Sequence, residues 1–198
     1  MPKFLNNSVK KISDDYDKTC YEMVHSLNKQ HFDKNLVENA NIIIVGTLTP
    51  ANGMTNGYYY TSERNKVYGL IDYCFGTEQN GLADLKKQLK QSSQKTEVLQ
   101  EIKKYLSAHK IAFLDVIDIA VRKIGSSLDD DIAQYTLDYE SFKHCSNRQK
   151  FVCTSKNAKL SLDKIAKFDN VTICHQDRFR CKKENWKKEL TSIWFIKK

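Results

Sequence analysis

The stretch Asn41-Ile-Ile-Ile-Val-Gly46 decides the fold. A β-branched run that a glycine ends is typical of a strand buried on both faces, and such strands occupy the centre of parallel sheets. Three more apolar runs follow, with helix-compatible sequence between them, over residues 111–116, 150–154 and 171–174. Strands that alternate with helices predict an α/β fold, a three-layer α/β/α arrangement around a central parallel sheet of about four strands.

Apolar residues between these strands recur at helical spacing. The repeat that starts at Val67 predicts a helix from near Ser62 to Gly76, which places Asn65 in its first turn. Similar spacing predicts helices over 14–28, over 82–108 in two parts, over 156–167 and over 182–195. We expect residues 1–198 to form a single domain, with a helical N-terminal segment of residues 1–41 packed on it.

The composition is basic, with 32 lysines and arginines against 24 acids and a net charge of +8. This excess attracts polyanions, so DNA or RNA is the expected partner class, unless the lysines only keep the surface soluble. No apolar run approaches the roughly 20 residues that span a bilayer, and the first residues do not resemble a secretory signal. We therefore expect a cytoplasmic monomer with no membrane partner.

The six cysteines include no CxxC pair, which favours reduced and mostly buried thiols. The alternative is a metal ion held by Cys145 with His144, and by Cys174 with His175 and Cys181. Zinc ligands are usually paired more tightly along the sequence. The spacing therefore favours no metal site.

Ligands of parallel sheets bind beyond the carboxyl ends of the strands. Four segments occupy such positions here, namely 46–65, 115–129, 154–157 and 175–181. Asp115, at a strand end, can either reach a site there or cap the next segment, whereas the acids at 129–131 are typical of a helix start. Neither GxxxxGK[ST] nor GxGxxG occurs, so a nucleotide phosphate loop is not expected.

Two stretches carry a family resemblance, Gly46-Thr-Leu-Thr-Pro50 and Gly57-Tyr-Tyr-Tyr-Thr-Ser-Glu-Arg-Asn65-Lys-Val-Tyr68. They resemble the first motif region of the uracil-DNA glycosylase superfamily, and are closest to its hypoxanthine-DNA glycosylase branch. Ile111-Ala-Phe-Leu-Asp-Val116 and Gly125-Ser-Ser-Leu-Asp129 extend the match, which covers roughly residues 42–132. The resemblance implies a DNA repair enzyme that hydrolyses the N-glycosidic bond of a flipped damaged, deaminated or modified base, without metal or cofactor.

By this resemblance, Asn65 is the catalytic asparagine. A neutral carboxamide can orient a water molecule or donate a hydrogen bond to the base without titrating. His175 follows the fourth strand, where the uracil-specific branch keeps a base-binding histidine, and it is the second catalytic candidate. Ordinary alternatives are a polar residue in a helix's first turn for Asn65 and a solvent-facing loop histidine for His175.

The same loops supply the predicted base-binding residues. Backbone N–H groups of the loop Gly46, Thr47 and Leu48 can bond the edge of a base. Tyr59 or Tyr60 can stack on the extruded ring, a contact of about 1–3 kcal/mol, although clustered tyrosines more often serve packing.

The chain departs from its relatives after the fourth strand, where they carry a serine- and proline-rich loop that presses on DNA. Phe179 is predicted to enter the base stack while Arg178 and Arg180 hold phosphates, unless this patch packs the final helix. Lys156, at a helix start, is a further predicted phosphate contact or else a solvated lysine. Pocket residues at 62–63 and 67–68 also differ, so the target base does not carry over.

Two other functions stay open at this stage. One is a catalytically inactive glycosylase-fold module that binds nucleic acid, for which DNA affinity would not depend on Asn65. The other is an unrelated α/β hydrolase of free nucleosides, which would show no DNA affinity.

Overall fold

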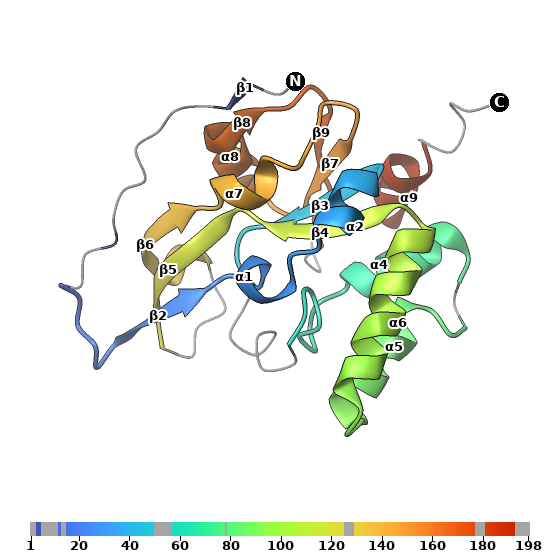
Figure 1. Ribbon diagram of the computed structural model, residues 1–198, viewed down its shortest axis with the longest axis horizontal. Helices are drawn as coiled ribbons and strands as arrows, with labels where there is room; N and C mark the ends of the chain where they lie inside the picture. The colour runs from blue at the N-terminus through green and yellow to red at the C-terminus, as the bar shows by residue number, and fades with distance from the viewer. Residues whose placement is uncertain are drawn as a thin grey trace.

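The computed structural model describes residues 3–4, 12, 15–49, 57–77, 79–124, 129–176 and 181–192. At its centre lies a four-stranded sheet in the order β4-β3-β7-β9, in which every neighbouring pair is parallel (Figure 1). Its strands are β3 (Ile42–Gly46), β4 (Ile111–Asp115), β7 (Lys150–Cys153) and β9 (Val171–Ile173). All residues of β3, β4 and β7 are buried. The four predicted strands and the parallel sheet are confirmed.

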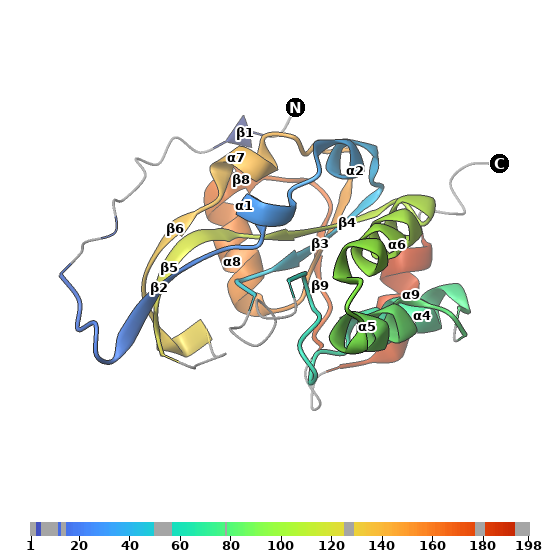
Figure 2. The same cartoon turned by 60° about the horizontal axis from the view of Figure 1, so that its bottom comes forward.

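Helices cover both faces of this sheet, because its strands are apolar on both sides. Ile42 and Ile44 join one hydrophobic cluster, whereas Ile43 and Val45 join the other, as the alternation of side chains along a strand requires. The first cluster is covered by α4 (Val67–Phe75), α5 (Leu82–Gln91), α6 (Lys95–Ala108) and α9 (Lys183–Thr191) (Figure 2). The second is covered by α2 (Lys34–Asn39), α7 (Tyr139–Phe142) and α8 (Lys156–Ile165). The predicted three-layer α/β/α arrangement is thus confirmed.

The start of α4 differs from the prediction. The helix ends at Gly76, as expected, where a positive φ of 69° favours glycine. It begins only at Val67, however, because the Asn65 side chain accepts a hydrogen bond from the Val67 N–H at 2.9 Å. The prediction that Asn65 lies in a first helical turn is therefore wrong, and it lies two residues before the helix.

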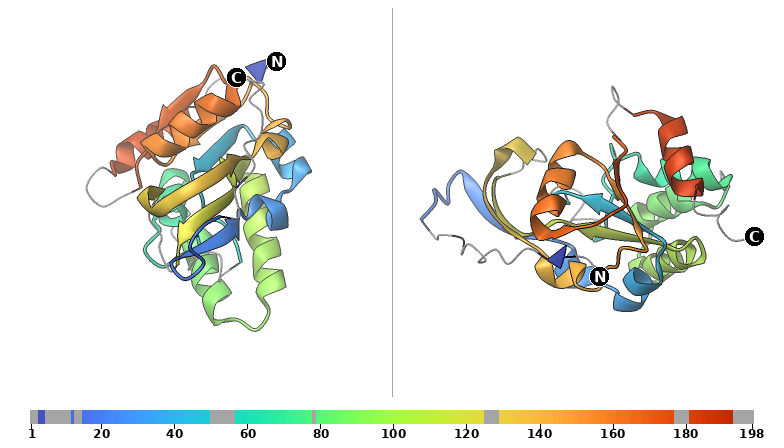
Figure 3. Two further views of the ribbon diagram at one scale, coloured as in Figure 1. Left: turned by 90° about the vertical axis from the view of Figure 1, so that its left-hand side faces the viewer. Right: turned by 90° about the horizontal axis from the view of Figure 1, so that it is seen from above.

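A second sheet was not predicted. It has three antiparallel strands in the order β2-β5-β6, formed by β2 (Tyr21–His25), β5 (Ile117–Lys123) and β6 (Ile132–Leu137). After Val116, β5 continues the line of β4, and Figure 3 (left) looks onto the sheet that it forms.

The helix predicted over residues 14–28 is wrong, and so is a wholly helical N-terminal segment. Residues 21–25 instead form a strand paired antiparallel with residues 119–123 of β5, which satisfies their backbone groups. Helical structure starts only at α1 (Asn28–His31). The acids at 129–131 form a single 3-10 turn, η1 (Asp129–Asp131), which leads into β6 rather than into an α-helix.

The short strands β1 (Lys3–Phe4) and β8 (Ala166–Lys167) pair with each other and bring the N-terminal strand against the end of α8. Within the ranges that the structure describes, no helix is long and apolar enough to cross a membrane.

Candidate active site

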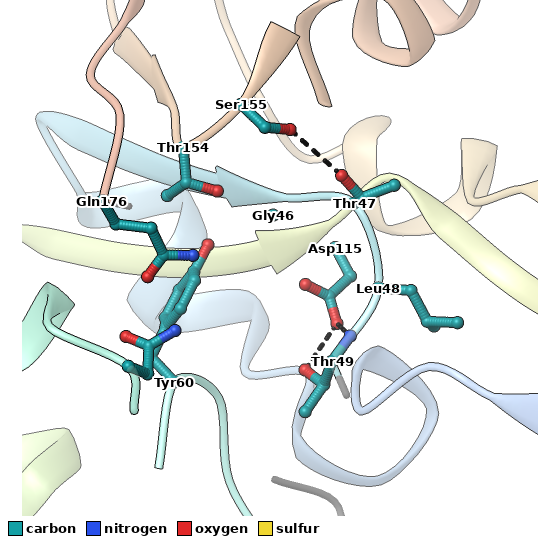
Figure 4. Close-up of a pocket in the computed structure, with 10 residues that line it drawn as sticks. Gly46, Thr47, Leu48, Thr49, Tyr60, Asp115, Thr154, Ser155 and Gln176 are labelled. Carbon is teal, nitrogen blue, oxygen red and sulfur yellow. Dashed lines mark hydrogen bonds between the residues drawn. The ribbon is translucent and has the colours of Figure 1, made fainter. Parts of the chain in front are cut away.

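A pocket of about 140 Å³ lies at the carboxyl ends of the parallel strands, where the strand-end rule places ligands (Figure 4). The ends of all four parallel strands and the loop before α4 contribute to it. Its lining residues are Gly46, Thr47, Leu48, Thr49, Tyr60, Asn65, Asp115, Thr154, Ser155 and Gln176. The fold thus brings together five segments from different parts of the sequence.

Gly46 lies in the pocket lining, where the side chains of Asp115 and Tyr60 approach its backbone closely. A Cβ atom at this position would lie 2.6 Å from Oδ1 of Asp115 and 2.9 Å from the hydroxyl oxygen of Tyr60. Such separations are too short for non-bonded atoms, so any side chain here would push one of these polar groups away. The glycine is therefore needed for the close approach of an acid and a phenol at the pocket.

Asp115 is the buried acid of the pocket, with 1% of its surface exposed. Its Oδ2 accepts hydrogen bonds from the backbone N–H of Thr49 at 2.9 Å and from the Thr49 hydroxyl at 2.8 Å. The Asn28 side chain bonds both backbone groups of Asp115, accepting from its N–H at 3.1 Å and donating to its carbonyl at 2.8 Å. Thr49 thus holds the carboxylate, and Asn28 holds the backbone that carries it.

Asn28 connects this acid to two further buried groups. Its Nδ2 also donates to Oδ2 of Asp138 at 2.5 Å, and its Oδ1 accepts from the Tyr59 hydroxyl at 2.5 Å. Burial, then the negative charge of Asp115, raises the pKa of Tyr59. Tyr59 was predicted as a base-stacking residue, but its side chain is committed to this network and does not line the pocket.

Tyr60 is the tyrosine that does line the pocket. Its φ of 57° lies in the left-handed region, which is strained for a side chain of this size. Its ring packs edge-on against Phe113 at 5.0 Å, and its hydroxyl points towards Gly46 and Thr154 (Figure 4). Burial, followed by the charge of Asp115, raises its pKa, which the nearby Thr154 hydroxyl opposes. No described residue makes a hydrogen bond of normal geometry with this buried hydroxyl.

Asn65 reaches the pocket from the helix side and is half-buried. Its Oδ1 accepts from the Val67 N–H, and its backbone carbonyl accepts from Nζ of Lys86 at 2.7 Å. Because the side-chain oxygen is engaged, the Nδ2 amide is the end that can donate to a ligand.

The loop after β3 carries the remaining predicted base-binding residues. Thr47 and Leu48 line the pocket, and the Thr47 hydroxyl lies 3.2 Å from that of Ser155. The Thr47 carbonyl accepts from the Ile117 N–H at 3.1 Å, which holds the loop against the junction of the two sheets. That its N–H groups bond a base stays a prediction.

Thr154, Ser155 and Gln176 were not singled out from the sequence, although the strand-end rule selected their segments. Ser155 accepts from the Ala158 N–H at 3.0 Å and caps α8. The side-chain oxygen of Gln176 is buried without a hydrogen-bond partner among the described residues. Serine, threonine and glutamine are common at such loops, so their types alone carried no signal.

His175, the second catalytic candidate, is not part of the pocket lining. Its backbone carbonyl accepts from the indole N–H of Trp186 at 3.0 Å, which anchors this segment to α9. The next residue, Gln176, is the one that reaches the pocket. Lys156 is exposed at the first turn of α8, beside the pocket residue Ser155. Three predicted DNA contacts lie outside the described residues, namely Arg178, Phe179 and Arg180.

The cysteines are free thiols, four of them buried, as predicted. Burial raises the pKa of Cys153 and of Cys174 to about 12, which keeps these thiols protonated and unreactive. In the part of the chain that the structure describes, no three side chains of histidine, cysteine, aspartate or glutamate are grouped so as to hold a metal ion.

Comparison with known proteins yields a similar fold and no sequence family. No family model and no curated protein matches the chain. Among solved structures, it is similar to a protein from Methanosarcina acetivorans whose solution NMR structure is described as that of "a putative Uracil DNA glycosylase". The two share 17% identity with a TM-score of 0.54, over 79% of this chain and 92% of that chain. The chain therefore has a uracil-DNA glycosylase-like fold, and nothing in this likeness selects the hypoxanthine-DNA glycosylase branch.

Proposed function

We propose that this chain is a DNA glycosylase, which takes a base flipped out of DNA into the pocket and hydrolyses its N-glycosidic bond. The observation that carries the proposal is a pair of buried polar groups at the pocket, the Tyr60 hydroxyl and Oε1 of Gln176, that make no hydrogen bond of normal geometry with the described residues. A buried unpaired polar group costs about 1–3 kcal/mol. The edge of a nucleobase, which offers both donors and acceptors, would pair with them.

The size of the pocket favours a small base. At about 140 Å³ it is close to the roughly 150 Å³ cavity that accommodates one benzene ring in a protein core. We therefore propose a pyrimidine as the target rather than a two-ring purine.

The pocket also suits the charges that develop during this hydrolysis. As the bond between C1′ and the base nitrogen breaks, the electron pair leaves with the base and the sugar becomes cation-like. The Asp115 carboxylate would stabilise that positive charge and orient the water that adds to C1′. The Asn65 amide and the Tyr60 hydroxyl would donate to the base as it becomes negative. The proton that the water loses ends on the departing base, so atoms and charge balance.

A panel of oligonucleotides tests the proposal. Single- and double-stranded DNA carrying uracil, a 5-substituted pyrimidine, hypoxanthine or xanthine is incubated with the protein and then cleaved with alkali at abasic sites. We expect strand breaks at one or more pyrimidines. Asp115→Asn, purified in the same way, controls for a contaminating host enzyme. Release by both preparations alike, or release of a free nucleoside's base with no DNA affinity, would refute the proposal.

A second candidate is the inactive glycosylase-fold module. One observation favours it, namely that Oδ1 of Asn65 is engaged by the Val67 N–H in a local turn just before α4. It predicts salt-dependent DNA binding that Asn65→Ala leaves unchanged, with no base released from any oligonucleotide. Under both functions, Lys156, Arg178 and Arg180 remain proposed phosphate contacts, and Phe179 remains a proposed contact to the base stack.

A further inference from the structure

A second cavity, of about 480 Å³, lies on the outer side of Asn65, between α4 and α5. Asn65 lines both this cavity and the base pocket, so the two are neighbours across one residue. Its charged lining consists of one glutamate, Glu63, and five lysines, namely Lys66, Lys86, Lys87, Lys90 and Lys183. We call this cavity the lysine groove.

From this groove we infer a binding site for the sugar-phosphate backbone of DNA, next to the flipped nucleotide. The inference rests on the proposed function for the position of that nucleotide. It adds a strand path over α4 and α5 that neither the sequence motifs nor the fold similarity indicates.

The charges of the groove are poorly neutralised by the protein itself. Lys66, Lys90 and Lys183 are exposed, and no described carboxylate lies within 4.0 Å of their ammonium groups, whereas Lys87 pairs with Asp84 at 2.7 Å. Desolvation, followed by repulsion from Lys90, lowers the pKa of Lys86. Like charges gathered in a concave surface attract a polyanion strongly, because the field there is focused.

The floor of the groove suits a sugar chain rather than a lone anion. Tyr68 lines it and is 1% exposed, and its hydroxyl has no hydrogen-bond partner among the described residues. Gly69 is exposed within α4 and presents no side chain, so the backbone of the helix is accessible. Leu70 and Ala83 complete an apolar floor beneath a basic rim. A DNA strand would fit this arrangement, with a deoxyribose against the apolar floor and its phosphates beside the lysines of the rim.

Lys86 links the groove to the pocket. Its Nζ donates to the backbone carbonyl of Asn65 at 2.7 Å and more weakly to that of Glu63 at 3.4 Å. A strand bound in the groove therefore lies against the lysine that holds Asn65 in place.

Charge removal tests the groove directly. The triple variant Lys66→Gln, Lys90→Gln, Lys183→Gln removes three charges that make no ion pair among the described residues. Its control is Lys34→Gln, Lys104→Gln, Lys143→Gln, which removes equal charge from exposed lysines elsewhere. Binding is measured on an undamaged oligonucleotide between 0.05 and 0.5 M salt, titrations that depend on no catalysis.

We expect the slope of log affinity against log salt to fall by about 2 to 3 in the groove variant, with about a hundredfold weaker binding near 0.1 M salt. The control should lose much less. Equal losses in the two variants would overturn the inference, as would a tighter groove-dependent affinity for RNA of the same sequence.

Gly69 offers a second, independent test. A Cβ at this position meets no atom within 4 Å, so a longer side chain can extend into the groove without a clash. Gly69→Glu and Gly69→Gln fill the space equally and differ in one charge. We expect Gly69→Glu to bind DNA at least fivefold more weakly than Gly69→Gln, and equal binding would count against the groove.

The two proposals fail separately. If the wild-type protein released a base and the groove variants bound DNA as the wild type does, the proposed role of the groove would be wrong and the proposed glycosylase activity would stand. Groove-dependent binding with no base release from any substrate would support the groove and refute the enzyme.

Discussion

The pocket has two sides that are held in different ways. On the sheet side, Asp115 is fixed by Asn28, which lies 87 positions away in the sequence, and by Thr49. On the helix side, the Asn65 side chain bonds the Val67 N–H, two positions along the chain. The Asn65 carbonyl accepts a hydrogen bond from Lys86, a partly buried residue of the lysine groove. Buried long-range bonds make a rigid wall, whereas local bonds beside solvent make a wall that DNA can contact. We therefore propose that the sheet side carries the charge that acts on the sugar and that the helix side contacts the DNA strand.

The largest expected effect is on the sheet side. Asp115→Asn keeps the shape of the side chain but removes the negative charge, and we expect single-turnover base release to slow about 10³-fold. Binding of undamaged DNA should change little, because the carboxylate lies inside the pocket. If the variant released the base within tenfold of the wild-type rate, Asp115 would have no catalytic role, and the proposed difference between the sheet side and the helix side would be wrong.

The rigidity of the sheet side can be measured as stability. Asn28→Ala leaves the Tyr59 hydroxyl, the Asp138 carboxylate and the Asp115 backbone short of partners, so we expect a loss of about 3 kcal/mol in the free energy of unfolding by urea. Asn39→Ala, which loses a bond from an exposed side chain to the Asn35 carbonyl, should cost under about 1 kcal/mol. Similar losses in both variants would mean that the Asn28 network does not hold the acid.

On the helix side, the local bond from Asn65 to the backbone and the proposed catalytic role of its amide can be tested separately. Asn65→Asp keeps an oxygen for the Val67 N–H but removes the amide donor, whereas Asn65→Ala removes both. We expect both to slow base release about 10²-fold, and only Asn65→Ala to lose about 1 kcal/mol of stability. Full activity in Asn65→Asp would show that the amide donates nothing to the base.

The smallest expected effect separates the adjacent tyrosines. Tyr60→Phe removes a hydroxyl that lacks a protein partner, so stability should hold while kcat/KM falls about tenfold. Tyr59→Phe removes a buried bond to Asn28, so it should lose about 1 kcal/mol of stability and little activity. Thermal melts measure the stability of each variant, and base-release rates measure its activity. A loss of stability in Tyr60→Phe and a loss of activity in Tyr59→Phe would mean that the two tyrosines have the opposite roles.

Local patterns predicted the parallel sheet but not the second sheet. The run at 42–46 is apolar at every position, and a helix or surface strand would not tolerate that pattern. Residues 21–25, in contrast, carry mixed polarity that also fits an amphipathic helix. Only the free edge of β5 decides between them, and that edge is created by a strand almost 100 residues later.

Local patterns likewise predicted some residues of the candidate site and missed others. Gly46, Tyr60 and Asn65 were predicted from contiguous motifs and do line the pocket. Gln176 and Thr154 were not predicted, since a single polar residue in a loop carries no sign of where its side chain will point. Tyr59 does not line the pocket, because its hydroxyl bonds Asn28, a partner 31 positions away that no local pattern indicates.

By itself, the sequence determined the α/β class, the four parallel strands and the edge of the sheet at which a ligand would bind, because each follows from periodicity within about ten residues. The tertiary structure alone decided that Asp115, Tyr60 and Gln176 share one pocket, and that five lysines border it through Asn65. These arrangements depend on contacts between segments that are distant in the chain, and the free energies of such contacts are invisible in any local pattern.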